Sequence, residues 1–359
     1  MGRWRQVWSS VVVVVLCQGA VVGTLVRGAV AAEGATAEAW DYRTAMREVT
    51  ARFRGEPGVV LHVGDSLTYS NPYGQWPRNG QGKSPEDQAT LKWMHLGRDD
   101  RRDGFWLARF DHPDGGRSHT ACSGVRMDEL LAGGKRGLPS LEKLLDEYRP
   151  QIVVLLCGTN DATARREAKD YLADARRAVD IILAKNVICI LSTIPPHYRE
   201  TERALAYNVG LRRLAEERRL PLIDLEREIL TRRPDDWNGT LLSRDDVHLS
   251  ASAPPVTTAS PPTDENLRAC GYLLRGWLSV RKISEVKLRA IDGVNPASAP
   301  LMPKTGAAAS PPAARPSGKP VRLPVTRDTR VSSYPGEETF SPGGASQIKL
   351  KSNQEMGLL

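Results

Sequence analysis

Residues 59–68 read Val-Val-Leu-His-Val-Gly-Asp-Ser-Leu-Thr, a run of strand-forming residues that ends in a glycine, an acid and a serine. A buried strand of this kind places the serine hydroxyl at the carboxyl edge of a sheet, where open α/β folds bind their ligands. Gly64 permits a sharp turn, and the helix expected next points its free N–H groups at the same place. We therefore interpret Ser66 as a nucleophile. The alternative is that Gly64, Asp65 and Ser66 are ordinary turn and cap residues.

Further strands and helices alternate along the chain. Residues 152–157 form a continuous apolar run, which is typical of a parallel strand covered on both faces. Apolar residues at helical spacing predict helices around residues 42–53, 127–131, 141–148, 172–182 and 204–214, and a long one that starts at Thr263 and stops near Gly293. The alternation predicts an α/β fold with right-handed crossovers and a parallel sheet of five strands. These strands are residues 59–63, 118–121, 152–157, 187–191 and 222–225.

The region that follows Ser66 lacks clear periodicity. It is polar up to about residue 103, and this region and its end carry four aromatic residues, Tyr73, Trp76, Trp93 and Trp106. A long loop at the serine's end of a sheet is a plausible wall for a substrate site. Equally, the aromatic residues could pin the loop to the core.

The first 32 residues resemble a secretory signal. Arg3 and Arg5 precede an apolar run over residues 11–26, and small residues at 29–32 offer a cleavage site. We expect residues 1–32 to be removed and the protein to be secreted or periplasmic. An uncleaved N-terminal anchor is the alternative, because the apolar run is long.

Composition changes again near the other end. A Pro/Ser/Thr insertion covers residues 251–262, just after Asp245 and His248. Residues 294–324 hold eight prolines among many alanines and serines, which predicts a disordered linker. We therefore expect a catalytic domain over 38–293 and a short β-rich tail over 325–359.

Charge and cysteine content exclude several classes of function. The net charge is +8, but basic and acidic residues alternate along helical faces, which indicates a solvated surface rather than a nucleic-acid groove. Cys157 and Cys189 lie in apolar runs and are expected in the core, whereas Cys122 and Cys270 are ambiguous, so a disulfide is possible but not required. No zinc-type cluster is present, no cofactor is indicated, and no segment of the mature chain could span a membrane.

Hydrolysis of an ester by a serine needs a base and a group that orients the base. Among six histidines, His248 is the best base because Asp245 precedes it by three residues. In a loop, this spacing lets the carboxylate reach Nδ1 while Nε2 faces the serine. Asp246 is nearer in sequence, but side chains so close in the chain diverge. His197 is the reserve base, and His62, inside a strand, is expected to be a core residue.

The reaction also needs donors for the developing oxyanion. Asn160 and Gly124 both follow predicted strands at the carboxyl edge that carries Ser66. Either residue could instead serve local structure, Asn160 as a helix cap and Gly124 as a turn residue. Asp65 and Asp161 are assigned to hydrogen bonding and capping.

Four stretches, in this order, resemble the sequence blocks of the SGNH (GDSL-type) hydrolase superfamily: 64–67 (Gly-Asp-Ser-Leu), Gly124, 158–161 (Gly-Thr-Asn-Asp) and Asp245-x-x-His248. The resemblance covers about residues 40–290. It implies a flavodoxin-like three-layer α/β/α sandwich. It further implies a Ser66–His248–Asp245 triad and an oxyanion hole made of Ser66 N–H, Gly124 N–H and Asn160. Two departures affect access to the site: a longer region after Ser66, and the insertion after His248.

The tail has a fainter resemblance. Residues 325–351 look like the opening strands of a β-sandwich module found beside secreted carbohydrate-active enzymes, cut short here. Together with export and the polar aromatic region, this favours a secreted serine esterase that removes short acyl groups from a carbohydrate. The alternatives are a lipid or thioester acyl hydrolase, which should have a more continuous apolar channel, and a non-catalytic surface binding protein. Oligomeric state is not predicted.

Overall fold

The computed structural model describes residues 40–293 except residues 99, 114 and 246. The predicted signal over 1–32, the linker over 294–324 and the tail over 325–359 lie outside the described residues. These assignments, and the boundary at 293, therefore stay predictions. Within the described part, no helix is both long and apolar enough to cross a membrane.

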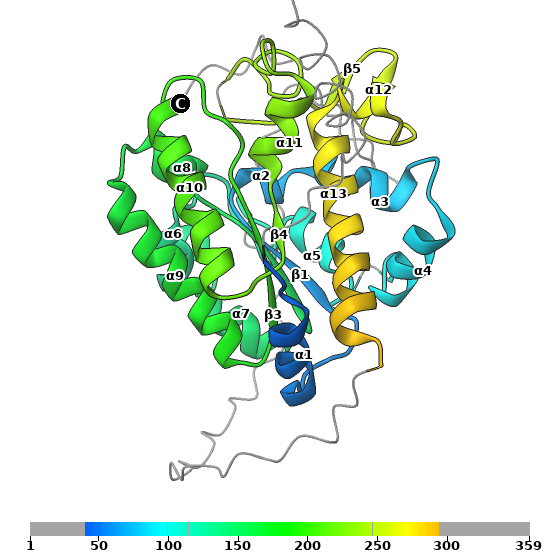
Figure 1. Ribbon diagram of the computed structural model, residues 1–359, viewed down its shortest axis with the longest axis vertical. Helices are drawn as coiled ribbons and strands as arrows, with labels where there is room; N and C mark the ends of the chain where they lie inside the picture. The colour runs from blue at the N-terminus through cyan, green and yellow to red at the C-terminus, as the bar shows by residue number, and fades with distance from the viewer. Residues whose placement is uncertain (1–39, 99, 114, 246, 294–359) are drawn as a thin grey trace, which may run out of the picture. The chain divides into compact units, whose positions relative to one another are not determined.

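A parallel sheet of four strands forms the centre of the molecule (Figure 1). The strands lie in the order β1-β2-β3-β4 and are in register from Val60 opposite Ile152 onward. Nearly all of their side chains are fully buried, which explains why the sequence shows apolar runs without alternation. The strands are β1 (Val60–Gly64), β2 (Ile152–Leu156), β3 (Ile188–Ser192) and β4 (Leu222–Ile223).

The predicted fifth strand at residues 118–121 is wrong. Only Ala121 pairs with the sheet, through a single parallel bridge to Gly64. The Ser118 hydroxyl accepts hydrogen bonds from the N–H groups of Thr120 and Ala121, which curls the segment into a turn. The Thr120 hydroxyl then donates to the carbonyl of His62 at 2.7 Å, so a side chain occupies an acceptor that a fifth strand would use. Ala121 still lies outside β1, so the chain order is the flavodoxin-like one that the resemblance implied.

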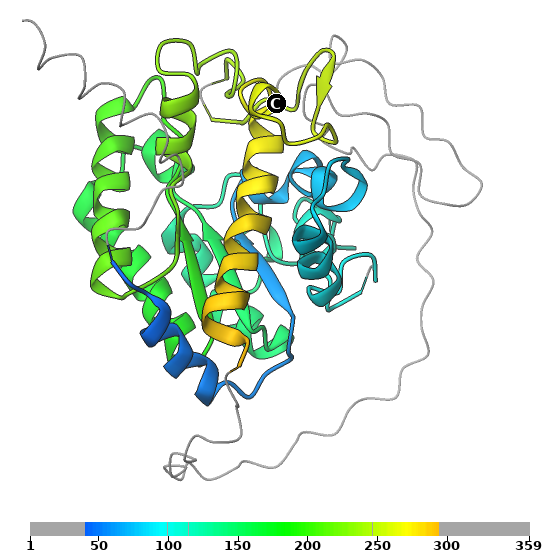
Figure 2. The ribbon, with the colours of Figure 1, turned by 45° about the vertical axis from the view of Figure 1, so that its right-hand side comes forward.

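Helices cover both faces of the sheet, as the three-layer prediction requires (Figures 1 and 2). α1 and α13 lie on one face, and the layer of α6, α7, α9 and α10 lies on the other. Their bounds are α1 (Arg43–Arg52), α6 (Met127–Ala132), α7 (Leu141–Tyr148), α9 (Ala168–Ala184), α10 (Thr201–Glu217) and α13 (Gly271–Val286).

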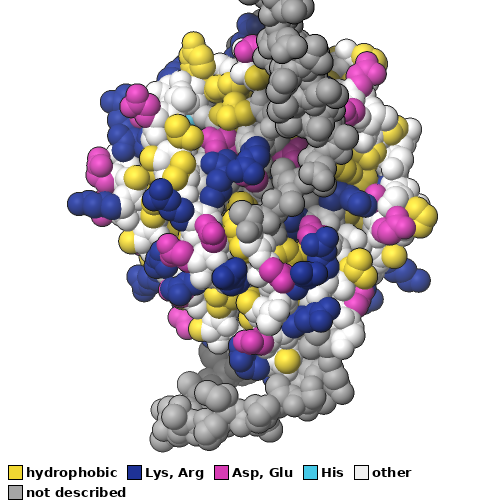
Figure 3. Space-filling model, in the orientation of Figure 1, with side chains coloured by type: hydrophobic (Ala, Val, Ile, Leu, Met, Phe, Trp, Pro, Cys, Tyr) yellow, Lys and Arg dark blue, Asp and Glu magenta, His cyan; other side chains and the backbone are white. Residues whose placement is uncertain are grey.

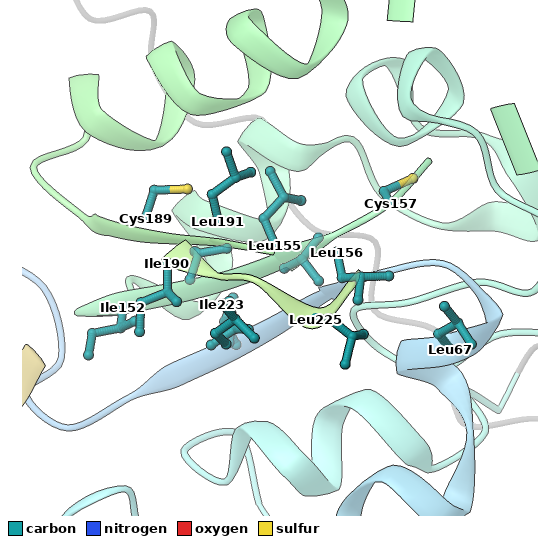
Figure 4. Close-up of a cluster of buried hydrophobic side chains, with 14 of the residues drawn as sticks. Leu67, Ile152, Leu155, Leu156, Cys157, Cys189, Ile190, Leu191, Ile223 and Leu225 are labelled. Carbon is teal, nitrogen blue, oxygen red and sulfur yellow. The ribbon is translucent and has the colours of Figure 1, made fainter. Parts of the chain in front are cut away.

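The core lies between these layers (Figure 4). Cys189 lies beside Leu191, and Cys157 lies further along, just beyond the end of β2; both are buried, as their apolar surroundings in the sequence predicted. Cys122 and Cys270 are also buried, and all four described cysteines are free thiols.

The region after Ser66 is not a loop but a series of short helices. Its Tyr73 and Trp76 are fully buried, so these rings pin the region to the core instead of forming a substrate wall, while Trp93 and Trp106 are partly buried. Four of these helices have only four to six residues, and α4 buries the polar Asp87 and Thr90 beside Leu91, so the region shows no clear apolar period. They are α2 (Ser66–Tyr69), the 3₁₀-helix η1 (Asn71–Gly74), α3 (Gln75–Asn79), α4 (Pro85–Trp93) and α5 (Gly104–Arg109).

The last predicted helix is divided in two. Thr263 is the N-cap of α12, as expected, because its hydroxyl accepts from the Asn266 N–H at 3.3 Å. The chain leaves helical geometry at Cys270 before α13 begins. The remaining elements are η2 (Lys135–Gly137), α8 (Thr159–Thr163), α11 (Leu225–Arg232), the hairpin β5 (Ser252–Ala253) and β6 (Val256–Thr257), α12 (Asp264–Leu267) and the π-helix η3 (Lys287–Ile291).

Candidate active site

Ser66 lies in the first turn of α2, directly beyond the carboxyl end of β1. Asp65 is the N-cap of that helix, since its Oδ1 accepts from the Leu67 N–H at 3.0 Å. Gly64 ends the strand so close to β2 that a Cβ there would lie 1.8 Å from the carbonyl oxygen of Leu156. The turn from strand to helix therefore needs a glycine, and it leaves the Ser66 side chain at the sheet edge with 6% exposure.

A continuous hydrogen-bond chain connects Ser66 to His248 and Asp245. His248 Nε2 lies 3.1 Å from Ser66 Oγ, and His248 Nδ1 lies 2.6 Å from Asp245 Oδ2. The other carboxylate oxygen, Oδ1, accepts the backbone N–H groups of Val247 and His248 at 3.1 and 2.9 Å. The carboxylate is thus fixed on its own loop, and it orients the imidazole with one nitrogen toward the serine.

The loop that carries His248 is anchored to the start of α13. Ser250 accepts hydrogen bonds from Gly271 N–H through its hydroxyl and from Tyr272 N–H through its carbonyl, at 2.9 and 3.0 Å. Leu242 and Leu249 form an antiparallel bridge across the base of the loop. The last long helix therefore sets where the imidazole stands.

The two acids near the site have opposite pKa shifts. Burial raises the pKa of Asp65 to about 6, because the fully buried carboxyl has lost its contact with water. The hydrogen bond from the Leu67 N–H lowers the pKa by less than burial raises it. Partial burial would also raise the pKa of Asp245, but the hydrogen bonds from His248 and Val247 outweigh it and lower the pKa to about 2. Asp245 is consequently ionised at any neutral or mildly acidic pH.

The three expected oxyanion donors follow adjacent segments of the sheet. Gly64 pairs with Ala121 on one side and with Leu156 on the other. The segments that follow these three residues, and that carry Ser66, Gly124 and Asn160, therefore leave the sheet side by side. Asn160 Nδ2 donates to the carbonyl of Val125 at 3.1 Å, which ties it to the residue after Gly124. The Asn160 side chain does not cap α8. Within the described residues, no backbone carbonyl accepts the N–H of Ser66 or of Gly124.

The remaining candidates have structural contacts. His62 is fully buried, with Nδ1 2.8 Å from the Tyr73 hydroxyl, and burial lowers its pKa to about 3. His197 accepts the Glu200 N–H at Nδ1 and lies 3.1 Å from the Thr163 hydroxyl through Nε2, so both its ring nitrogens are engaged away from Ser66.

The other acid, Asp161, accepts the Met127 N–H at 3.0 Å and pairs with Arg166 at 2.6 Å. Asp161 lies inside α8, and its carboxylate accepts the first N–H of α6 instead of capping α8.

Two basic residues near the site were not predicted. Arg275 is buried in α13, donates to the carbonyl of Leu67 and to the Thr68 hydroxyl, and lies 3.8 Å over the Tyr73 ring. An arginine among the mostly apolar residues 271–280 of this helix was a signal that could have found it. Lys135 donates to the carbonyl of Gly124 at 2.6 Å, and nothing in its glycine-rich surroundings indicated this contact.

A serine bound to an imidazole that is itself bound to a carboxylate, at the carboxyl edge of a parallel sheet, defines a class of hydrolases that cleave acyl bonds. The family model for the GDSL-like Lipase/Acylhydrolase family matches residues 62–253, which include all four sequence blocks. The chain belongs to this family and is an enzyme that hydrolyses ester bonds. No curated protein sequence matches it.

Among solved structures, the chain is similar to a catalytic mutant of the acetylxylan esterase Axe2 from Geobacillus stearothermophilus. The identity is 18%, the alignment covers 62% of this chain and 93% of that one, and the TM-score is 0.40. It is also similar to the lipase/acylhydrolase from Enterococcus faecalis, with 18% identity, 63% and 95% coverage and a TM-score of 0.38.

Proposed function

We propose that Ser66 is the nucleophile of a serine esterase, that His248 is its general base and that Asp245 orients the base. The observation that carries this proposal is the unbroken chain of hydrogen bonds from Ser66 Oγ through His248 to Asp245. Each step is within the distance at which a proton can transfer.

In this mechanism, Ser66 Oγ attacks the carbonyl carbon of the ester while its proton moves to His248 Nε2. The tetrahedral intermediate then collapses, the imidazolium gives that proton to the departing alcohol, and the acyl group stays on the serine. A water molecule, deprotonated by the same imidazole, then attacks the acyl carbon. The second tetrahedral intermediate collapses to the acid, and the imidazolium returns the proton to Ser66 Oγ. Asp245 stays ionised throughout because its pKa is about 2, and its charge stabilises the imidazolium.

The oxyanion of the intermediate would be bound by the N–H groups of Ser66 and Gly124 and by Asn160. One hydrogen of the Asn160 amide is used by the Val125 carbonyl, which fixes the direction of the other. Donors that are held in place before the charge develops stabilise the transition state far more than donors that must rotate into position.

We further propose that the substrate is a carbohydrate that carries short acyl groups. Tyr198 is 62% exposed, and its ring lies 6.4 Å from that of Trp237 in an edge-on arrangement. The Trp237 carbonyl accepts the Leu242 N–H at the base of the loop that carries His248. Tyr198 follows His197, which contacts the end of α8, the helix that carries Asn160. An aromatic pair between these two segments offers an apolar face on which a sugar ring can stack.

The test is turnover of p-nitrophenyl esters of two to sixteen acyl carbons, together with acetate release from an acetylated oligosaccharide. We expect fastest turnover on acetate or propionate, loss of at least about 1000-fold in Ser66→Ala and in His248→Ala, and little change in His197→Ala. Full activity of folded Ser66→Ala would refute the nucleophile. A preference for long acyl chains would favour a lipid substrate instead.

Export is a separate part of the proposal and rests on residues 1–32. Expression in a host with a secretory system, followed by N-terminal sequencing of the extracytoplasmic protein, should give a mature chain that begins near Glu33. Recovery of an intact N-terminus in the membrane fraction would favour the uncleaved anchor.

A further inference from the structure

Both carbonyl groups of the segment 124–125 are bound by side-chain nitrogens. Lys135 Nζ donates to the Gly124 carbonyl at 2.6 Å, and Asn160 Nδ2 donates to the Val125 carbonyl at 3.1 Å. The first of these donors is not part of the mechanism above. It reaches the segment from the turn that follows α6.

We propose that Lys135 is a positioning residue for the oxyanion hole, an inference that rests on the proposed function. Gly124 has a left-handed backbone with φ of 75°, and a glycine moves between backbone conformations more easily than any other residue. Its N–H can act as a preorganised donor only if the peptide groups around it are held. The lysine holds the peptide on the C-terminal side of Gly124. This contact restricts the backbone rotations at the glycine that would turn its N–H away from the site.

Lys135 is itself held by two sets of contacts. Its ammonium pairs with Glu129 Oε2 at 3.0 Å, and the same carboxylate oxygen accepts the Arg126 N–H at 2.9 Å. The turn around it is closed by hydrogen bonds between Gly134 and Leu138 and between Leu138 and Lys135, at 2.7 and 2.9 Å. The lysine is therefore placed by its backbone and aimed by a partner fixed on α6.

The ammonium can also act through its charge. A Cβ on Gly124 would lie 3.8 Å from Nζ, so the ammonium lies beside the residue whose N–H is a proposed oxyanion donor. Glu129 offsets part of this field. A variant that keeps the charge and a variant that keeps only the bulk of the side chain can separate positioning and charge from simple packing.

A role in stability alone predicts something different. The side chains of Lys135 and Glu129 are 30% and 26% exposed, and ion pairs with this access to solvent contribute little to folding. Lys135→Met should therefore fold and melt close to the wild-type temperature. Any large loss of turnover in it would then come from the site.

The experiment compares Lys135→Met, Lys135→Arg and Lys143→Met, the last a control on an exposed lysine of the next helix, α7. Three quantities are measured: kcat and KM on p-nitrophenyl acetate, the inhibition constant of phenylboronic acid, whose serine adduct is tetrahedral, and the melting temperature. We expect Lys135→Met to lower kcat about 10-fold, to weaken phenylboronic acid by a similar factor and to change KM less than about 2-fold. Lys135→Arg should restore most of kcat, and Lys143→Met should match the wild type.

Two results would overturn the inference without affecting the proposed function: a kcat for Lys135→Met within about 2-fold of the wild type, or unchanged inhibition by phenylboronic acid. Both presuppose a wild-type enzyme that hydrolyses the ester and loses this activity in Ser66→Ala. Absence of wild-type turnover, or full turnover by Ser66→Ala, would overturn the proposed function and this inference together.

Discussion

At the scale of single residues, Asn160 separates a catalytic role from a structural one. Asn160→Ala removes one proposed oxyanion donor and its hydrogen bond to the Val125 carbonyl. We expect kcat to fall about 100- to 1000-fold with KM nearly unchanged, and stability to fall by about 1 kcal/mol. Kinetics and urea unfolding on one preparation check both values. If Asn160→Ala lowers the free energy of unfolding but leaves kcat unchanged, Asn160 is not an oxyanion donor.

Asp65 should make stability depend on pH. Its pKa is about 6 in the folded protein and about 4 in the unfolded chain, so between these values the native state holds a proton that the unfolded state has lost. Stability must then fall as pH rises from about 4 to about 6, by on the order of 3 kcal/mol at about 1.4 kcal/mol for each pKa unit.

The matched variant for this prediction is Asp65→Asn, which keeps an oxygen for the Leu67 N–H and carries no charge. Urea unfolding at several pH values should show it more stable than the wild type above pH 6 and similar near pH 4. Parallel pH curves for the two proteins would show that the buried carboxyl is not protonated as expected.

Most residues of the site were predictable. Ser66 and Asn160 come shortly after the apolar runs that form β1 and β2, and the spacing of Asp245 and His248 allows only a few loop geometries. Gly124 follows a segment that is not a strand, so only the resemblance to the family's sequence blocks supported it. The structure brings Ser66, His248 and Asp245 into contact and ties Asn160 to the segment of Gly124. The roles of these residues stay predictions. Lys135 could not be foreseen, because its contact depends on a glycine-rich turn whose path the sequence does not specify.

At the scale of elements, α13 supports both the nucleophile and the base. Its N-terminus anchors the His248 loop, and its Arg275 binds the carbonyl and the hydroxyl at the end of α2. Replacing Arg275 with Met would leave two buried acceptors unsatisfied. We expect a loss of about 2–4 kcal/mol in the free energy of unfolding.

Arg281→Met is the control on the same helix, because Arg281 is half exposed and lies 3.4 Å from Asp87. Its loss should cost less than about 1 kcal/mol. If both variants lower the free energy of unfolding by the same amount, the buried guanidinium of Arg275 stabilises the fold no more than the half-exposed one of Arg281.

Helices with a clear apolar period were predictable, and those without one were not. The apolar periods of α7, α9 and α10 extend over two turns or more, and their expected positions agree with the structure. Most helices between Ser66 and residue 109 have too few turns to show a period, and α4 buries Asp87 and Thr90 beside Leu91, which hides its period. The fifth strand failed for a different reason, because the Thr120 hydroxyl replaced a backbone donor, and strand propensity does not register such an exchange.

At the scale of the whole molecule, the face shown in Figure 3 mixes charges of both signs. This agrees with a solvated surface, despite a net charge of +8 for the full sequence. All residues of the proposed mechanism lie between Ser66 and His248, and the structural supports end within α13.

Deletion of residues 294–359 should therefore leave turnover of a soluble short ester and the melting temperature nearly unchanged, because a proline-rich linker adds no packed core. If the tail binds glycans, the same deletion should weaken retention on an insoluble polysaccharide. If it is a remnant, retention should not change. A large drop in turnover or melting temperature would show that the tail packs against the enzyme, and the boundary at 293 would be wrong.

The nucleophile and the base lie 182 residues apart in the sequence, and the loop that carries the base is anchored in part by residues that come later still, at 271 and 272. Under the proposed mechanism, a nascent chain on the ribosome carries its reactive serine long before it can use it. Hydrolysis becomes possible only after the segment that forms α13 has emerged and docked. A chain that ends before residue 271 should therefore carry Ser66 and His248 and still hydrolyse esters far more slowly than the full chain.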